Sequence, residues 1–142
     1  MTERFDSSKL DWKSYNLGVI MGFAECVGAG VKKLALSASM SSDEYDMIID
    51  DVELIAKENR VLLYTDEDFL ETLLFPAAYT RGKTVIHIYQ NQSINDEYLE
   101  LKDKKKMHEE AGTLTDEIQR ELAWSLGKLL SYSIEAIQRR LK

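Results

Sequence analysis

Cysteine is almost absent from this sequence: Cys26 is the only one among 142 residues. A single cysteine cannot form a disulfide within the chain. The chain does not open with a basic stretch followed by an apolar run, so we expect no secretory signal. Folding without disulfides fits a reducing compartment, and we expect a cytoplasmic protein.

Long apolar runs are also absent. Leu17–Val27 falls short of the roughly 18 apolar residues that a membrane-spanning helix needs. The 25 acidic residues outnumber the 18 Lys and Arg, which gives a net charge of −7 that opposes binding to phosphate backbones or anionic lipid. We therefore exclude nucleic acid and membranes as partners. Hydrophobic residues make up 44% of the chain, enough for one core, so we expect a single domain over residues 1–142.

Motifs for metal and nucleotide binding are scarce. The two histidines, His87 and His108, are too few for a zinc cluster within one subunit. The chain has neither a Walker motif nor a GxGxxG sequence, which are the usual phosphate-binding signatures. No motif in the chain identifies a family, so its residues have to be interpreted one by one.

Apolar periodicity predicts helices that alternate with short strands. We expect a loose arm over 1–13, strands at 34–36, 61–65 and 84–89, and helices at 15–27, 43–59, 66–75, 95–110, 115–130 and 133–141. The expected helix caps are Asp11 or Ser14, Ser41 with Ser42, and Ser133. Residues 113–142 form a C-terminal helical pair. The first helix has only one charge within its apolar stretch, Glu25, and is therefore expected to be buried on all sides.

This alternation of strands and helices favours parallel pairing through right-handed crossovers. We predict an α/β fold, a three-layer α/β/α arrangement with a small parallel sheet of three strands and additional C-terminal helices. The crossover helices would cover one face, and the first and C-terminal helices the other. The edges of such a small sheet need cover from those helices or from another copy, so we expect a homo-oligomer.

Ligands of parallel sheets bind beyond the carboxyl ends of the strands. This rule selects the segments 37–42, 65–68 and 89–93. The hydroxyls of Ser37, Ser39 and Ser42 are candidates for binding a small anion, such as a phosphorylated or nucleotide-like ligand, at a helix N-terminus. The alternative is that these serines only cap the helix. Arg81 and Lys83 precede the third strand and are expected at the opposite edge.

Carboxylates follow the second strand. Asp66 and Asp68 are candidate ligands for Mg²⁺, a cation that prefers oxygen. Acids at a helix start also have an ordinary role in stabilising the helix dipole, which is the alternative.

Two residues are candidates for acid–base catalysis. Glu25, if buried, would have a raised pKa and could act as an acid or base; otherwise it pairs with Lys32 or Lys33 near the helix end. His87 lies on the third strand, on the face of Val85 and Tyr89, where it is either catalytic or a hydrogen-bonded structural residue.

Two functions remain open. The first is a small-molecule-binding protein or small enzyme that acts on an anionic ligand at the carboxyl ends of the strands. The second is a non-enzymatic adaptor that presents apolar residues of its C-terminal helices, namely Leu126, Leu129, Leu130, Ile134 and Ile137. The basic run 102–106 is followed by acids and is expected to be a solvated helix face.

Overall fold

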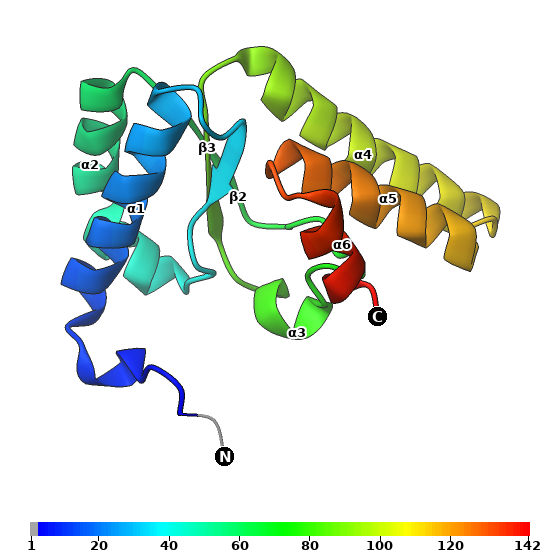
Figure 1. Ribbon diagram of the computed structural model, residues 1–142, viewed down its shortest axis with the longest axis horizontal. Coiled ribbons are helices and arrows are strands. Elements are labelled where there is room, and N and C mark those ends of the chain that lie inside the picture. The colour runs from blue at the N-terminus through cyan, green and yellow to red at the C-terminus, as the bar shows by residue number, and fades with distance from the viewer. Residues whose placement is uncertain (1–2) are drawn as a thin grey trace.

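Helices cover both faces of a small central sheet (Figure 1). The computed structural model describes residues 3–142, so the first two residues of the predicted arm lie outside the described residues. The elements are η1 (Ser7–Lys9), α1 (Trp12–Gly28), β1 (Leu34–Leu36), α2 (Ser42–Asn59), β2 (Leu62–Asp66), α3 (Ala77–Thr80), β3 (Val85–Tyr89), α4 (Gln92–Ala111), α5 (Asp116–Leu129) and α6 (Ile134–Arg140). Among the described residues, no helix has both the length and the apolar character needed to cross a bilayer.

The sheet has the strand order β1-β3-β2, and β3 is antiparallel to both of its neighbours. His87 at the centre of β3 lies opposite Leu36 on one side and Tyr64 on the other. The predicted parallel sheet is therefore wrong. β1 and β2 run in the same direction, as their connection through α2 suggested, but β3 is inserted between them in the opposite direction.

The connection between β2 and β3 explains the antiparallel pairing. A third parallel strand would need a crossover of a dozen or more residues, usually a helix, to return the chain to the end of the sheet where β1 and β2 begin. The predicted helix over 66–75 does not form. The backbone N–H of Asp68 donates to Asp66 Oδ1 at 3.0 Å, and that of Leu70 donates to the Tyr98 hydroxyl at 2.9 Å. These side chains compete with helical hydrogen bonding, so the chain stays near the end of β2 and β3 runs back from there.

This topology changes which loops lie together. The carboxyl ends of β1 and β2 lie beside the amino end of β3, at one end of the strands. The segments 37–42 and 65–68 share that end of the sheet, as predicted. Arg81 and Lys83 lie at the same end rather than the opposite one, whereas the segment 89–93 lies at the opposite end, away from the segments 37–42 and 65–68.

One face of the sheet is covered by α1 and α2 (Figure 1). The core of this layer contains Ile20, Ala24, Val27, Ala35, Met40, Ile48, Val52, Ala56, Val61, Ile86 and Ile88. A Cβ at Gly28 would lie 2.6 Å from the Asn59 carbonyl oxygen, so glycine permits the close approach of α1 to α2. The expectation that α1 is buried on all sides is wrong, because Met21 is 54% exposed and Glu25 is also exposed. α1 buries only the stripe that contacts the sheet and α2.

The other face is covered by α4, α5, α6 and the segment 67–76. The core of this layer contains Leu34, Phe69, Leu70, Leu74, Val85, Tyr89, Tyr98, Ala123, Leu126, Leu129, Leu130 and Ile137. Four of the five apolar residues that an adaptor would present are therefore buried within the chain, and only Ile134, at 61% exposure, remains available. The structure does not support docking through this stripe.

Candidate functional site

Asp66, the last residue of β2, is the centre of a buried polar network. Its Oδ2 accepts hydrogen bonds from His87 Nε2 at 3.1 Å and from the Tyr98 hydroxyl at 2.5 Å. Its Oδ1 accepts from Lys102 Nζ at 3.1 Å and from the backbone of Asp68. Lys102 was expected on a solvated face, but its ammonium reaches inward from α4. We call Asp66, His87, Tyr98 and Lys102 the Asp66 network.

Burial and hydrogen bonding determine which groups of the Asp66 network carry protons. Burial opposes the charge of Asp66, but hydrogen bonds from His87 and Tyr98 outweigh burial and keep the pKa of its carboxyl below 3.8. Burial lowers the pKa of His87, against the opposing effect of Asp66, and burial with Asp66 raises the pKa of Tyr98. A neutral His87 donates through Nε2–H to an ionised Asp66, and its buried Nδ1 has no partner among the described residues.

This geometry is structural rather than catalytic. His87 has no exposed surface and packs against the rings of Tyr64, Phe69 and Tyr98, so a substrate cannot reach it. Both Asp66 oxygens accept hydrogen bonds from protein donors, while Asp68 is exposed. Among residues 3–142, no group of three or more His, Cys, Asp or Glu side chains could hold a metal ion. The Asp66 network therefore connects β2, β3 and α4 inside the protein and offers no open position for a metal or substrate.

Two other predicted residues lie apart from any enclosed site. Glu25 is exposed on α1, so it lacks the burial that the catalytic hypothesis required. Ser42 is the exposed first residue of α2, and the cap is Ser41, whose hydroxyl accepts from the Glu44 backbone at 3.1 Å. These residues do not come together with Ser37 or Ser39.

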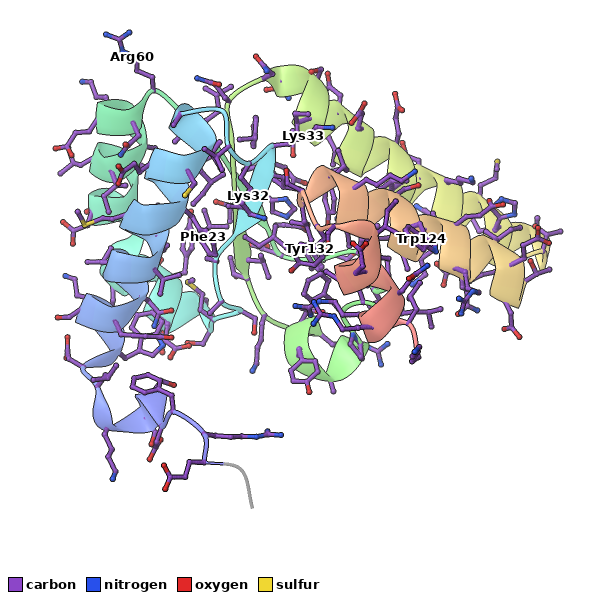
Figure 2. The ribbon with its side chains drawn as sticks, in the orientation of Figure 1. Phe23, Lys32, Lys33, Arg60, Trp124 and Tyr132 are labelled. Carbon is purple, nitrogen blue, oxygen red and sulfur yellow. The ribbon has the colours of Figure 1, made fainter. Side chains whose placement is uncertain are left out.

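Ser37 and Ser39 line a cleft of about 370 Å³ at the β1 edge of the sheet, between α1 and the turn that joins α5 to α6. Figure 2 shows Phe23 on α1, and Lys32 and Tyr132 on the side facing it. The lining residues are Val19, Phe23, Lys32, Leu36, Ser37, Ala38, Ser39, Phe69, Phe75, Tyr79, Thr80, Val85, Leu130 and Tyr132. We call this the Lys32 cleft. Most of its wall is apolar, as is typical of small-molecule sites.

Among the described residues that line the cleft, Lys32 is the one that carries a charge. Its ammonium donates a hydrogen bond to the Leu130 carbonyl and lies 5.3 Å from the centroid of the Tyr132 ring. The Arg140 guanidinium lies 4.9 Å from the same ring, so two cations gather at Tyr132. Burial lowers the pKa of Lys32, and the nearby Cys26 only partly opposes this effect. No Asp or Glu is found among the described lining residues.

Sequence reasoning selected Ser37 and Ser39, which line the Lys32 cleft in the structure, but it did not select Lys32 or Thr80, which line the same cleft. A signal for Lys32 was present. Side chains alternate between the two faces of a strand, so continuing the alternation of Leu36 and Leu34 backwards places Lys32 on their face and Lys33 on the other. Thr80 had no such signal, because α3 forms in a segment for which the sequence predicted neither a helix nor a strand.

The comparisons with known proteins add no assignment to this geometry. The chain matches no protein-family model, no curated protein and no solved structure.

Proposed function

We propose that this protein binds a small molecule in the Lys32 cleft, and that the molecule has an apolar body and a carboxylate that pairs with Lys32. One observation carries the proposal: among residues 3–142, Lys32 is the one charged residue that lines this mostly apolar cleft, and it contacts a carbonyl and an aromatic ring rather than an acid. A partly buried charge without a counter-ion is costly, and an anionic ligand would supply that counter-ion.

The wall of the cleft favours a monoanion over a phosphate. Lys32 is the one charge in the described lining, because Arg140 contacts the Tyr132 ring from outside that lining. The side chains beside Lys32, such as Phe23 and Leu36, cannot solvate further negative oxygens. A volume of about 370 Å³ lies at the lower end of the range for small-molecule sites, roughly 300–1,000 Å³. The described lining includes hydroxyls but no histidine or carboxylate that could activate them, so the geometry supports binding rather than catalysis.

The test compares octanoate with octanol, which has the same chain length but no charge, by isothermal titration calorimetry. We expect the wild-type protein to bind octanoate more tightly than octanol. Lys32→Met keeps the apolar stem and removes the charge, so it should bind octanoate about ten- to a hundredfold more weakly and leave octanol unchanged. The matched control is Lys33→Met, because Lys33 is the adjacent lysine, is exposed, and lies outside the cleft.

Three results would contradict the proposal: no binding of octanoate, equal affinity for octanoate and octanol, or an equal loss in Lys32→Met and Lys33→Met. Melting temperatures of both variants check that they fold.

Self-association stays a prediction, supported by the two edge strands β1 and β2 of the sheet. The mass of the protein in solution, measured on the same samples, tests it.

A further inference from the structure

The two edges of the sheet differ in how they are protected. β1 has three residues, the Lys32 cleft lies along its edge, and the Lys33 N–H at its start donates to Ser131 Oγ at 3.0 Å. β2 has five residues and pairs with β3 without a bulge. Its half-buried to exposed segment 62–65 contains no proline and no charge, which are features that commonly keep an edge strand from pairing. The edge of β2 is therefore open to another strand.

Hydrogen bonding within the sheet shows which residues of β2 face that edge. The Ile86 carbonyl accepts at 2.9 Å from the N–H of the residue that follows β1, so the backbone of Ile86 faces β1. Backbone groups of successive strand residues point to opposite sides, so those of His87 face β2 and bond to its register partner, Tyr64. The N–H and carbonyl groups of Leu63 and Thr65 consequently point away from β3. Among residues 3–142, no backbone group outside the sheet bonds to them.

These outward-facing groups are complementary to those of a second copy. Antiparallel pairing about a two-fold axis at Tyr64 places Leu63 of one copy opposite Thr65 of the second copy, and the symmetry repeats the pair. Each pair exchanges two hydrogen bonds, so every outward group of β2 is used. An axis one residue earlier or later would leave Leu63 or Thr65 without a partner in β2.

The side chains on the α4 face of the sheet also fit this arrangement. Tyr64 packs against the core on that face, and at the axis it would lie directly opposite Tyr64 of the second copy. Leu62, an apolar residue that is 45% exposed, would lie diagonally beside the same ring and be covered by it. Aromatic and aliphatic pairs of this kind stabilise the pairing of antiparallel strands.

Charges at the two ends of β2 are complementary in the same arrangement. Arg60 lies two residues before β2, Glu67 and Asp68 follow it directly, and all three are exposed. Among residues 3–142, none of the three forms an ion pair. Figure 2 shows the Arg60 side chain pointing away from the body of the molecule. Antiparallel pairing puts the start of one strand beside the end of the other, so each Arg60 would lie beside Glu67 and Asp68 of the second copy.

We infer that two copies of this protein pair through β2 about a two-fold axis at Tyr64, so that their three-stranded sheets join into one antiparallel sheet of six strands. This dimer assigns the expected self-association to one edge, and a two-fold dimer is the commonest form of homo-oligomer. The Lys32 cleft stays open, because it lies at the β1 edge on the other side of β3. Dimerisation is therefore independent of ligand binding in the cleft.

Cysteine cross-linking tests the register. In a Cys26→Ser background, Tyr64→Cys places two thiols opposite each other at a Cα separation of roughly 4.5 Å, which a disulfide can span. Diamide should convert most of this variant to a covalent dimer of twice 16.3 kDa. The matched controls are Leu63→Cys and Thr65→Cys, whose thiols would meet only if the axis lay one residue away. They should form little covalent dimer.

Charge reversal tests the two ends of β2. Sedimentation equilibrium of the wild-type protein over a concentration series should give a mass that approaches twice 16.3 kDa. Arg60→Glu sets like charges beside each other and should raise the dissociation constant of the dimer about tenfold. Adding Asp68→Arg restores an opposite charge and should recover part of this loss. Arg139→Glu makes the same change in net charge at an exposed residue of α6 and should leave the constant unchanged.

Hydrogen exchange of the wild-type protein provides a test without substitutions, since the N–H groups of Leu63 and Thr65 should become more protected as the concentration rises. A mass of 16.3 kDa throughout the series overturns the inference. A dimer in which these N–H groups exchange freely, or in which Leu63→Cys or Thr65→Cys cross-links better than Tyr64→Cys, also overturns it. Melting temperatures check that the variants fold. Octanoate titrated into Arg60→Glu should bind as it does to the wild type, so failure of the dimer leaves the proposed function standing.

Discussion

Two neighbouring polar regions of this protein differ in whether their charges have partners. In the Asp66 network, the buried carboxylate accepts from His87, Tyr98 and Lys102 and from a backbone N–H. In the Lys32 cleft, the cation lines a wall without an acid, and the Thr80 hydroxyl has no partner among the described residues. Phe69 belongs to both regions, because it packs against His87 and Tyr98 and also lines the cleft.

This difference is the basis for proposing a stabilising role for the Asp66 network and ligand binding for the Lys32 cleft. Asp66 has protein donors at both oxygens, and His87, whose Nδ1 has no partner among the described residues, has no exposed surface that a ligand could reach. Lys32 instead lines a solvent-accessible cleft, where a ligand can pair with it. Residue type alone would have favoured the Asp66 network, which contains an acid and a histidine. The hydrogen bonds favour the Lys32 cleft.

The largest expected effect is on stability, from Asp66→Ala. The substitution leaves Lys102, His87 and Tyr98 without their shared acceptor, and breaking a buried pair in this way costs about 3–5 kcal/mol of unfolding free energy. Urea unfolding followed by circular dichroism measures it. The control Asp68→Ala changes an exposed neighbour and should stay within about 0.5 kcal/mol. Similar losses in the two variants would mean that the network is not what stabilises this layer.

A matched pair of lysine substitutions tests the comparison directly. Lys102→Met removes the cation beside a buried carboxylate and should lower the unfolding free energy by about 1–3 kcal/mol. Lys32→Met removes a cation that has no acid partner and should change it by less than about 1 kcal/mol, in either direction. Urea unfolding without ligand measures both. A reversed order of the two losses would contradict the assignment of one lysine to stability and the other to binding.

The smallest expected effect is the change of the unfolding free energy with pH just below neutral, which depends on His87. Burial lowers its pKa in the folded state below the ordinary 6.5, so the unfolded chain binds the proton first and stability falls as the pH falls below about 6.5. The slope is at most about 1.4 kcal/mol per pH unit for one proton. A second loss begins below pH 3.8, where the unfolded chain protonates Asp66 and the folded protein resists protonation.

His87→Gln retains an N–H donor for Asp66 without a titrating ring, so it should remove the first loss of stability and keep the second. The control is His108→Gln, which lies outside the network and hydrogen-bonds to Thr113. Urea unfolding across the pH range measures these slopes. An unchanged slope in His87→Gln would show that a group other than His87 causes the loss of stability below pH 6.5.

The part of the candidate site that could be predicted was its location at the end of β1. Ser37 and Ser39 follow that strand in any strand arrangement, so the error in strand direction did not move them. The role of these serines was not predictable, because Ser37 Oγ accepts from the Ile86 backbone and Ser39 Oγ donates to the Tyr79 carbonyl, and both bonds depend on how distant segments meet. The same dependence hid Thr80.

The sequence by itself determined the five longer helices α1, α2, α4, α5 and α6 and where most of them begin, but it did not predict α3, and the helix that it predicted over 66–75 does not form. The predicted caps Asp11, Ser41 and Ser133 each accept a hydrogen bond from a backbone N–H three residues ahead, and the helix over 92–111 ends at Gly112 in the left-handed conformation. These features depend on neighbours within one helical turn, so local residue types suffice to predict them.

Only the tertiary structure decided the direction of β3, the burial of α1 and the partners of the charged residues. The Tyr98 hydroxyl donates a hydrogen bond to Asp66, 32 residues away, and accepts one from the Leu70 N–H. The bond to Leu70 competes with helical hydrogen bonding, so it helps prevent the crossover helix that a parallel sheet would need. Lys32 reaches the Leu130 carbonyl across 98 residues. Such contacts exist only after distant elements have packed, and they determined which polar groups are paired and which remain available to a ligand.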